Sequence, residues 1–296
     1  MTDEKRIAAA EAAAAANETA AKAATTTPKK NMLEVRGVSK TFNKGTINEK
    51  LALDNVSLTL EDEDFITVIG GNGAGKSTLM NAIAGVWAVD SGRILIDGTD
   101  VTGIGEHKRA AYLGRVFQDP MTGTAATMGI DENLALAKRR GRKHVLKWGV
   151  TRQEKKEYYE LLKTLDLGLE DRMTSKVGLL SGGQRQALTL LMATLQKPKI
   201  LLLDEHTAAL DPKTAAKVLT LSEKIIKDNH LTAMMVTHNM KDAIQYGNRL
   251  IMMNEGHIIL DIRGEEKRKL TVEDLLQKFE QASGEEFAND EALLAK

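Results

Sequence analysis

A glycine-rich stretch at residues 70–78, GGNGAGKST, constrains the fold of this chain more than any other feature. It follows an apolar run at residues 65–69 and precedes a helix-like run at residues 79–87. The pattern G-x-x-x-x-G-K-[ST] is typical of a phosphate-binding loop, because glycines let the backbone N–H groups curl inward and the following helix adds its dipole. A glycine-rich turn without a ligand is the alternative, which the flanking strand and helix disfavour. The predicted phosphate-binding residues are Gly70, Gly71, Asn72, Gly73, Ala74, Gly75, Lys76, Ser77 and Thr78. Lys76 would reach the β- and γ-phosphates, and the Ser77 hydroxyl would bind Mg²⁺.

A continuous apolar run at residues 200–203 predicts a strand buried on both faces of a parallel sheet. It ends in Asp204 and Glu205, and ligands of doubly wound sheets bind at this carboxyl edge. We expect Asp204 to hold Mg²⁺ through water and Glu205 to accept a proton from an attacking water. A solvated strand end is the alternative, but the phosphate loop earlier in the chain favours the catalytic interpretation.

Three further features follow in the second half of the chain. His238 comes after an apolar run at residues 232–237 and should reach the same sheet edge, although a structural role would also account for it. Asp211 precedes a proline and should cap a helix, which by itself would explain it. The stretch LSGGQ at residues 180–184 opens a helical run and predicts a second anion-binding helix N-terminus. Two phosphate cradles in one chain indicate that two chains face each other.

Elsewhere, alternating apolar residues at 33–38 and 51–60 predict antiparallel strands, with Phe42 in a polar turn between them. Phe42 would either pack locally or stack on a purine base. Residues 121–178 are helical in tendency and polar. They contain a basic cluster that would form either a solvated face or a contact with anionic lipid. The cluster consists of Lys138, Arg139, Arg140, Arg142, Lys143 and Lys147.

Composition excludes several classes of function. Lys plus Arg and Asp plus Glu both number 41, so net charge gives no support for nucleic acid as a partner. The absence of cysteine excludes disulfides and thiol catalysis. No segment approaches the ~18–20 apolar residues that span a bilayer, so a membrane function would depend on a partner subunit. The Ala-rich residues 1–31 are predicted to be a flexible tail, either inert or a tether.

Together these motifs resemble those of the ATP-binding-cassette family, whose signature reads Leu-Ser-Gly-Gly-Gln. The resemblance covers roughly residues 32–262, with the motifs in the family's order. It implies an α/β fold of the P-loop NTPase (RecA-like) type. That fold has a parallel-sheet core, an N-terminal antiparallel β-subdomain and an inserted α-helical subdomain at about 119–178. Residues 263–296 would form a C-terminal helical extension.

The resemblance also implies residue roles. Phe42 would stack on adenine, Gln118 would sense Mg²⁺ and couple to a transmembrane partner, and His238 would contact the γ-phosphate. Glu205 would be the catalytic base, and Lys76, Gln118 and His238 would be the other catalytic residues. The metal would be held by Ser77, Gln118 and Asp204. The D-loop aspartate would be Asp211, and the residues that close over the nucleotide of the opposite subunit would be Ser181, Gly182, Gly183 and Gln184, which follow Leu180.

The implied function is an ATP-hydrolysing subunit that uses ATP and Mg²⁺ to energise a membrane transporter from the cytoplasmic face of the membrane. Its partners would be transmembrane permease subunits, an extracytoplasmic substrate-binding protein and a second, identical ATPase subunit. His206 and Ala208 replace the proline and serine usual in the family. The segments at residues 204–211 and 264–276 resemble those of a bacterial subgroup of the family. That subgroup is associated with the import of amino acids, including aromatic ones.

Three alternatives remain at this point. An exporter ATPase is compatible with every motif. A soluble cassette ATPase acting on ribosomes or DNA is disfavoured, because the chain has one phosphate loop and only about a hundred residues between Lys76 and Leu180. A nucleotide-binding regulator without turnover is disfavoured by the presence of both Glu205 and His238.

Overall fold

The computed structural model describes residues 29–141 and 149–283. The elements described below all belong to one compact unit that begins at Asn31. The predicted tail therefore lies almost wholly outside the described residues, as does the end of the predicted C-terminal extension.

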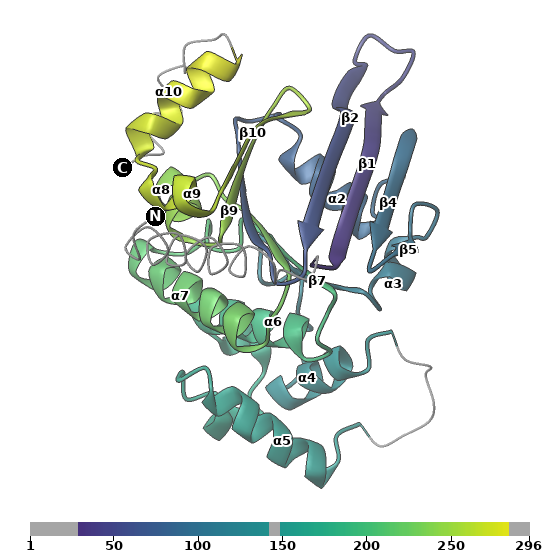
Figure 1. The fold of residues 1–296 in the computed structure, drawn as a ribbon. Helices are drawn as coiled ribbons and strands as arrows, with labels where there is room; N and C mark the ends of the chain where they lie inside the picture. The colour runs from purple at the N-terminus through teal and green to yellow at the C-terminus, as the bar shows by residue number, and fades with distance from the viewer. Residues whose placement is uncertain (1–28, 142–148, 284–296) are drawn as a thin grey trace, which may run out of the picture. The chain divides into compact units, whose positions relative to one another are not determined.

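A four-stranded antiparallel sheet, with strand order β2-β1-β4-β5, forms the N-terminal part of this unit (Figure 1). The predicted antiparallel pair is confirmed, since β1 pairs with β2 from Asn31 opposite Glu61 to Phe42 opposite Lys50. The strand at residues 91–96 adds to the free edge of β1. The strands are β1 (Asn31–Phe42), β2 (Lys50–Glu61), β4 (Ser91–Ile96) and β5 (Thr99–Asp100).

A six-stranded sheet with the order β10-β9-β3-β8-β7-β6 forms the centre of the unit. Its strands are parallel except for β10, which returns antiparallel to β9 as a hairpin. The strand before the glycine-rich loop, β3, lies between β8 and β9, both from the last third of the chain. The strands are β3 (Phe65–Ile69), β6 (Leu113–Val116), β7 (Ile200–Asp204), β8 (Ala233–Val236), β9 (Arg249–Asn254) and β10 (His257–Arg263).

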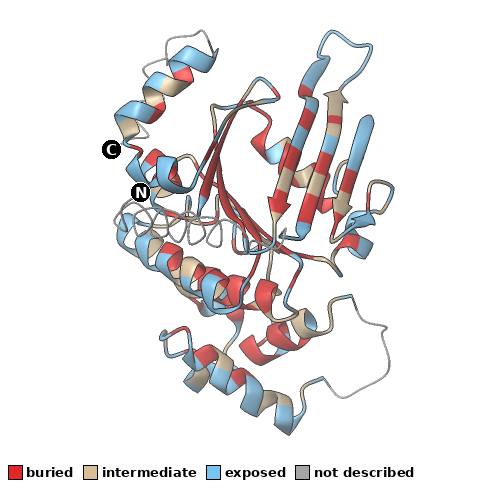
Figure 2. Cartoon of the chain, viewed as in Figure 1, coloured by how far each residue is buried: buried red, intermediate tan, exposed pale blue. Residues whose placement is uncertain are grey.

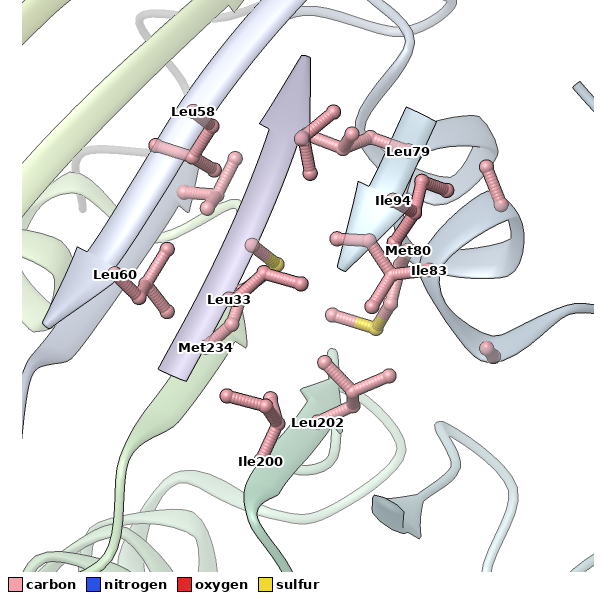
Figure 3. Close-up of a cluster of buried hydrophobic side chains, with 14 of the residues drawn as sticks. Leu33, Leu58, Leu60, Leu79, Met80, Ile83, Ile94, Ile200, Leu202 and Met234 are labelled. Atoms are coloured by element: carbon pink, nitrogen blue, oxygen red, sulfur yellow. The ribbon is translucent and has the colours of Figure 1, made fainter. Parts of the chain in front are cut away.

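The strand β7 is buried on both faces, as its apolar run predicted. Ile200 and Leu202 pack in the core beneath the antiparallel sheet (Figure 3), while Leu201 and Leu203 pack in a second core on the opposite face. This division follows from the strand period of two, which sends alternate side chains to opposite faces. Figure 2 shows buried residues along the parallel strands of the central sheet, whereas the edge strand β10 is mostly exposed or half-buried. Both faces of the sheet are therefore covered, as expected for a parallel sheet.

Some helices cover the central sheet, and others form a separate cluster (Figure 1). The helix α2 contributes to the core beneath the antiparallel sheet, whereas α6 and α7 contribute to the core on the opposite face. The helices α4 and α5 share a third core with the start of α6. The helices are α2 (Lys76–Ala84), α3 (Glu106–Arg109), α4 (Ile130–Lys138), α5 (Arg152–Lys163), α6 (Gly182–Thr194), α7 (Pro212–Asp228), α8 (Met240–Gln245), α9 (Gly264–Lys269) and α10 (Val272–Ser283), with 3₁₀ turns η1 (Glu170–Arg172) and η2 (Val177–Leu179).

Local sequence signals account for several helix ends. Asp211 caps α7, its carboxylate accepting a hydrogen bond from the Thr214 N–H at 3.1 Å, and Pro212 is the first helical residue, as predicted. The helix α2 ends at Gly85, whose φ of 81° is left-handed. We had expected that helix to span residues 79–87. The structure instead starts it at Lys76, within the loop motif, and stops it three residues earlier.

The C-terminal end of α2 is held by Arg109, the last residue of α3. Its side chain is buried, and Nη1 donates to the carbonyls of Ala82 and Ile83 at 2.6 and 2.8 Å. Nε donates to Ile104 at 2.6 Å and Nη2 to Thr102 at 3.0 Å. The last carbonyls of a helix lack intrahelical partners, so one guanidinium satisfies two of them here. Arg109 thereby ties the helix that follows the phosphate loop to the chain that follows β5.

Within residues 29–141 and 149–283, no helix combines the length and the apolar character that a membrane crossing requires.

Candidate active site

The glycine-rich loop joins β3 to α2 and is tightly enclosed. Gly70, Gly73 and Gly75 have φ values of 148°, 83° and 102°. Residues with a side chain rarely adopt these backbone conformations. A Cβ on Gly70 would lie 2.1 Å from the Met253 carbonyl oxygen, and one on Gly75 would lie 2.6 Å from that of Ala52. Only glycine therefore fits at these two positions, and the loop can curl as a phosphate cradle requires.

The turn between β9 and β10 braces this loop from the outside. The Gly256 N–H donates to the Ala74 carbonyl at 3.0 Å, and the Asp54 N–H donates to the Gly256 carbonyl at 3.1 Å. Residues from three distant parts of the chain thus fix the loop's backbone.

Lys76 lies inside the loop and is 5% exposed. Its Nζ donates to the carbonyls of Gly70 at 2.5 Å and Gly71 at 2.9 Å. The same residue begins α2, whose first-turn N–H groups have no partner within the helix. An ammonium group and several amide donors thus converge at one point, which is the donor set that a polyphosphate requires.

Glu205 and His238, from the ends of neighbouring strands β7 and β8, meet at the mouth of this loop. The His238 Nε2 lies 2.5 Å from Glu205 Oε1. The hydrogen bond from His238, together with the charges of His238 and Lys76, holds the pKa of Glu205 below its usual range despite partial burial. The carboxylate is therefore ionised at neutral pH and can accept a proton.

A cavity of about 310 Å³ unites these groups. It is lined by Phe42, residues 72–78, Glu205 and His238. The prediction that Phe42 lies in a turn is wrong. The pairing of β1 with β2 continues to Phe42, so this residue lies at the end of a strand. Its ring meets Trp87 edge-on, with centroids 4.8 Å apart. The structure thus brings together the loop, the aromatic ring and two of the predicted catalytic residues.

The other predicted residues lie outside this cavity. Asp204 ends β7 and forms an ion pair with Arg115, whose Nη2 is 2.9 Å from Asp204 Oδ2. Gln118 is exposed in the segment after β6. Ser181 caps α6, accepting from the Gln184 N–H at 3.3 Å while its own N–H donates to Gln184 Oε1 at 3.2 Å.

The start of α6 borders a different cavity, of about 650 Å³, shared with α7. Ser181, Gly183 and Gln184 line it, and Asp211 lies nearby as the cap of α7. A single chain therefore keeps its two predicted phosphate cradles apart.

The residues predicted to hold Mg²⁺ have suitable chemistry, because Ser77 and Asp204 offer the oxygen donors that this ion prefers. No group of three or more His, Cys, Asp or Glu side chains that could hold a metal occurs in the described parts of the chain. Mg²⁺ commonly binds through one or two protein oxygens together with substrate phosphates and water. The site fits a metal that arrives with a nucleotide.

Sequence reasoning missed Arg115 and Lys50. Lys50 lines the nucleotide-sized cavity from the start of β2. Arg115 lies on β6, three residues before Gln118. A charged residue inside an otherwise apolar strand was the available signal.

Three members of the basic cluster have protein partners. Lys138 lies 2.5 Å from Glu157, and Arg139 lies 3.2 Å from Glu154. Arg140 donates from Nη2 to the Ala193 carbonyl at 3.0 Å. These contacts favour the structural interpretation of those three residues. Residues 142–148, which contain the rest of the cluster, lie outside the described residues.

His206, which follows the predicted base, is buried at 2% exposure. Its Nε2 lies 2.9 Å from the Ser222 Oγ, and that hydroxyl donates to the Val218 carbonyl at 2.8 Å. Because the hydroxyl proton is used in this way, His206 Nε2–H must be the donor to Ser222. Burial lowers the pKa of His206 to about 4, so the ring is neutral at physiological pH.

This burial predicts a pH-dependent stability. The unfolded chain takes up a proton at His206 below pH ~6.5, whereas the folded chain resists it until pH falls to about 4. The free energy of unfolding should therefore fall by about 2 kcal/mol between pH 7 and pH 5 through this group. Urea unfolding at the two pH values should show that His206→Gln loses this part of the decrease. The exposed His107→Gln should keep it, and equal decreases in both variants would contradict the assignment.

Comparison with known proteins places this geometry in context. The profile of the ABC transporter family matches residues 53–208. The tyrosine transport ATP-binding protein of Clostridioides difficile is 46% identical over 251 residues, covering 85% of this chain and 100% of that protein. The methionine import ATP-binding protein of Corynebacterium diphtheriae is 35% identical over 232 residues, covering 77% of this chain and 64% of that protein. The chain thus spans slightly less than two thirds of the methionine relative.

Among solved structures, the fold resembles a dimeric ATP-binding cassette in a post-hydrolysis state bound to ADP and Pi. That structure has a TM-score of 0.67 and 28% sequence identity, covering 78% of this chain and 98% of that one. The predicted α/β fold of the P-loop NTPase type is confirmed by this likeness together with the mixed sheets described above.

Proposed function

The chain belongs to the ABC transporter family and is an ATPase of that family, and we propose that it energises the import of an aromatic amino acid such as tyrosine. The observation that carries the proposal is the cavity in which the phosphate loop, Glu205 and His238 meet. The full-length match to the tyrosine transport protein supports the substrate class, and the match to the methionine import protein supports the direction.

In the proposed mechanism the loop at residues 70–78 and Lys76 bind the β- and γ-phosphates of ATP, and Phe42 stacks on the base. Glu205 takes a proton from the attacking water, for which its lowered pKa keeps it ionised. His238, whose Nε2 already contacts Glu205, orients that carboxylate and would contact the γ-phosphate. Most of the acceleration then comes from positioning and charge stabilisation.

We assign the Mg²⁺ ligands to Ser77 and Asp204, with Gln118 joining them when the nucleotide is bound. A bound Mg²⁺ would supply charge neutralisation at the phosphoryl oxygens. Asp204 has one oxygen engaged by Arg115, and the exposed Gln118 must move inward to contribute.

A second copy of the chain would complete each site. Residues 181–184 do not line the cavity that Lys76 lines, so the two phosphate cradles of one chain do not serve one nucleotide. In a two-fold dimer each cradle would meet the phosphate loop of the other copy. The likeness to a dimeric cassette supports this arrangement.

The permease would bind at a groove of about 460 Å³ between β6, α4 and α6. Arg115, Phe117, Leu136 and Arg140 line it, and Leu136 is 53% exposed. The segment from Gln118 to about Ala137, which contributes several lining residues, would form the docking surface at this groove. Through the permease the chain would lie at the cytoplasmic face of the membrane, with a substrate-binding protein on the other side.

Two measurements test the proposed function. First, the tagged chain should co-purify from native membranes with an integral membrane protein. Second, deletion of the gene should lower cellular uptake of labelled tyrosine by about tenfold or more, with methionine uptake as the matched control. Wild-type protein should restore uptake and Glu205→Gln should not. Ribosomal or DNA-bound partners, together with unchanged tyrosine uptake, would overturn the proposal.

A further inference from the structure

The ion pair between Arg115 and Asp204 connects the groove proposed for the permease with a proposed ligand of Mg²⁺. Arg115 lies on β6 opposite Leu202 of β7, so it shares a sheet face with Asp204, two residues further on. The 2.9 Å contact is largely shielded, with the side chains 14% and 17% exposed. Screening of this pair by water is therefore weaker than for an ordinary surface ion pair.

The same guanidinium also belongs to the groove. Its centre lies 4.6 Å from the centroid of the Phe117 ring, and both residues line the cavity of about 460 Å³. The Arg115 Nε is buried and has no hydrogen-bond partner in the described structure. Arg140 lines the same groove, and its Nε is also buried without a hydrogen-bond partner in the described structure. An unpaired buried N–H is costly, so both groups favour an acceptor that enters the groove.

Asp204 cannot serve two cations fully at once. Arginine stays protonated at all physiological pH values, so while it holds Asp204 Oδ2 it offsets the negative charge that would attract Mg²⁺. A purely structural pair would also explain the contact with Asp204. It leaves the guanidinium incompletely satisfied, however, because the Arg115 Nε–H lies on the same edge as Nη2 and still has no hydrogen-bond partner in the described structure.

We propose that Arg115 is a positioning residue that weakens Mg²⁺ binding at Asp204 until a carboxylate of the permease enters the groove and draws the guanidinium toward itself. The occupant is an acidic side chain because two arginines with unsatisfied Nε groups line the groove. The proposal rests on the proposed function, since it names the chemistry of the permease segment. Docking would thereby release the carboxylate for the metal.

The first test measures metal affinity rather than activity. Mn²⁺, which shares the oxygen-ligand preference of Mg²⁺, is titrated into the full chain in a one-to-one complex with ADP, and free Mn²⁺ is followed by electron paramagnetic resonance. Arg115→Met should raise the affinity by about fivefold or more. Arg115→Lys keeps the competing charge and should stay near the wild-type value. Arg139→Met removes the same charge from the pair with Glu154 and should also change little.

Unchanged or weaker Mn²⁺ binding by Arg115→Met would overturn the proposal. Circular dichroism confirms that the variant is folded, and Arg115→Gln provides a second neutral variant if it is not. The two neutral variants should agree.

The second test repeats the titration on the co-purified complex with the permease. The wild-type affinity should rise toward that of Arg115→Met, while the variant should gain nothing from the permease. A permease that binds without changing the wild-type affinity would refute the link to the groove and leave the proposed function intact. Failure of any membrane protein to co-purify would count against the proposed function itself, whereas the first test stands independently of it.

Discussion

Replacing Glu205 by glutamine should lower the turnover number for ATP hydrolysis by about 10²–10⁴-fold. The substitution preserves size but removes the ability to accept a proton. The position is sensitive because Glu205 is ionised at neutral pH, lies 2.5 Å from His238 and lines the cavity of the phosphate loop. Nucleotide binding should persist, since Lys76 and the loop amides remain. Phosphate release and equilibrium nucleotide binding, measured on the same preparation, separate the two effects.

Glu223→Gln is the matched control for this experiment. It makes the same chemical change on α7, where Glu223 forms an i,i+4 pair with Lys227 at 2.8 Å. Its turnover number should stay within about twofold of the wild type, as expected for a surface substitution. Undiminished hydrolysis by Glu205→Gln would show that another group is the base.

Replacing Arg109 by methionine should destabilise the protein by about 3–5 kcal/mol. Four backbone carbonyls accept hydrogen bonds from its guanidinium, and at 2% exposure water cannot replace them. The midpoint of thermal unfolding should fall by about 10 °C in a domain of this size. Calorimetry or circular dichroism measures the shift.

The comparison variant is Arg36→Met, because the Arg36 side chain is 57% exposed and forms an ion pair with Glu34, two residues away. Its stability should change by about 0.5 kcal/mol or less. If both variants melt together, the carbonyls around Arg109 are satisfied in another way and the helix end does not depend on this residue.

Features set by local sequence were predictable. The loop motif, the both-sided burial of β7, and the cap at Asp211 each follow from residue order within a few positions, and the structure has them. Where the prediction failed, distant residues decided the outcome. Phe42 lies in a strand because Lys50 pairs with it across the sheet, and the sequence around Phe42 alone favours a turn.

Charge partners were the least predictable part of the site. Arg115 meets Asp204 only because β6 and β7 are neighbours in register, and nothing in the spacing of the two residues indicates this. The cations Lys138 and Arg139 likewise find Glu157 and Glu154 through the packing of two helices. A linear pattern shows that a charge is present, while its partner depends on the assembled fold.

The position of β3 between β8 and β9 has a consequence for how the protein is made. The nucleotide loop is encoded early, but both neighbours of its strand and the Gly256 turn that braces it come from residues 233–256. During synthesis at roughly 5–20 residues per second, the nascent chain must therefore wait many seconds with an apolar strand unpaired. The ATP site therefore forms late in synthesis. A chain truncated before residue 256 contains the whole loop motif but lacks the turn that fixes the loop's backbone conformation.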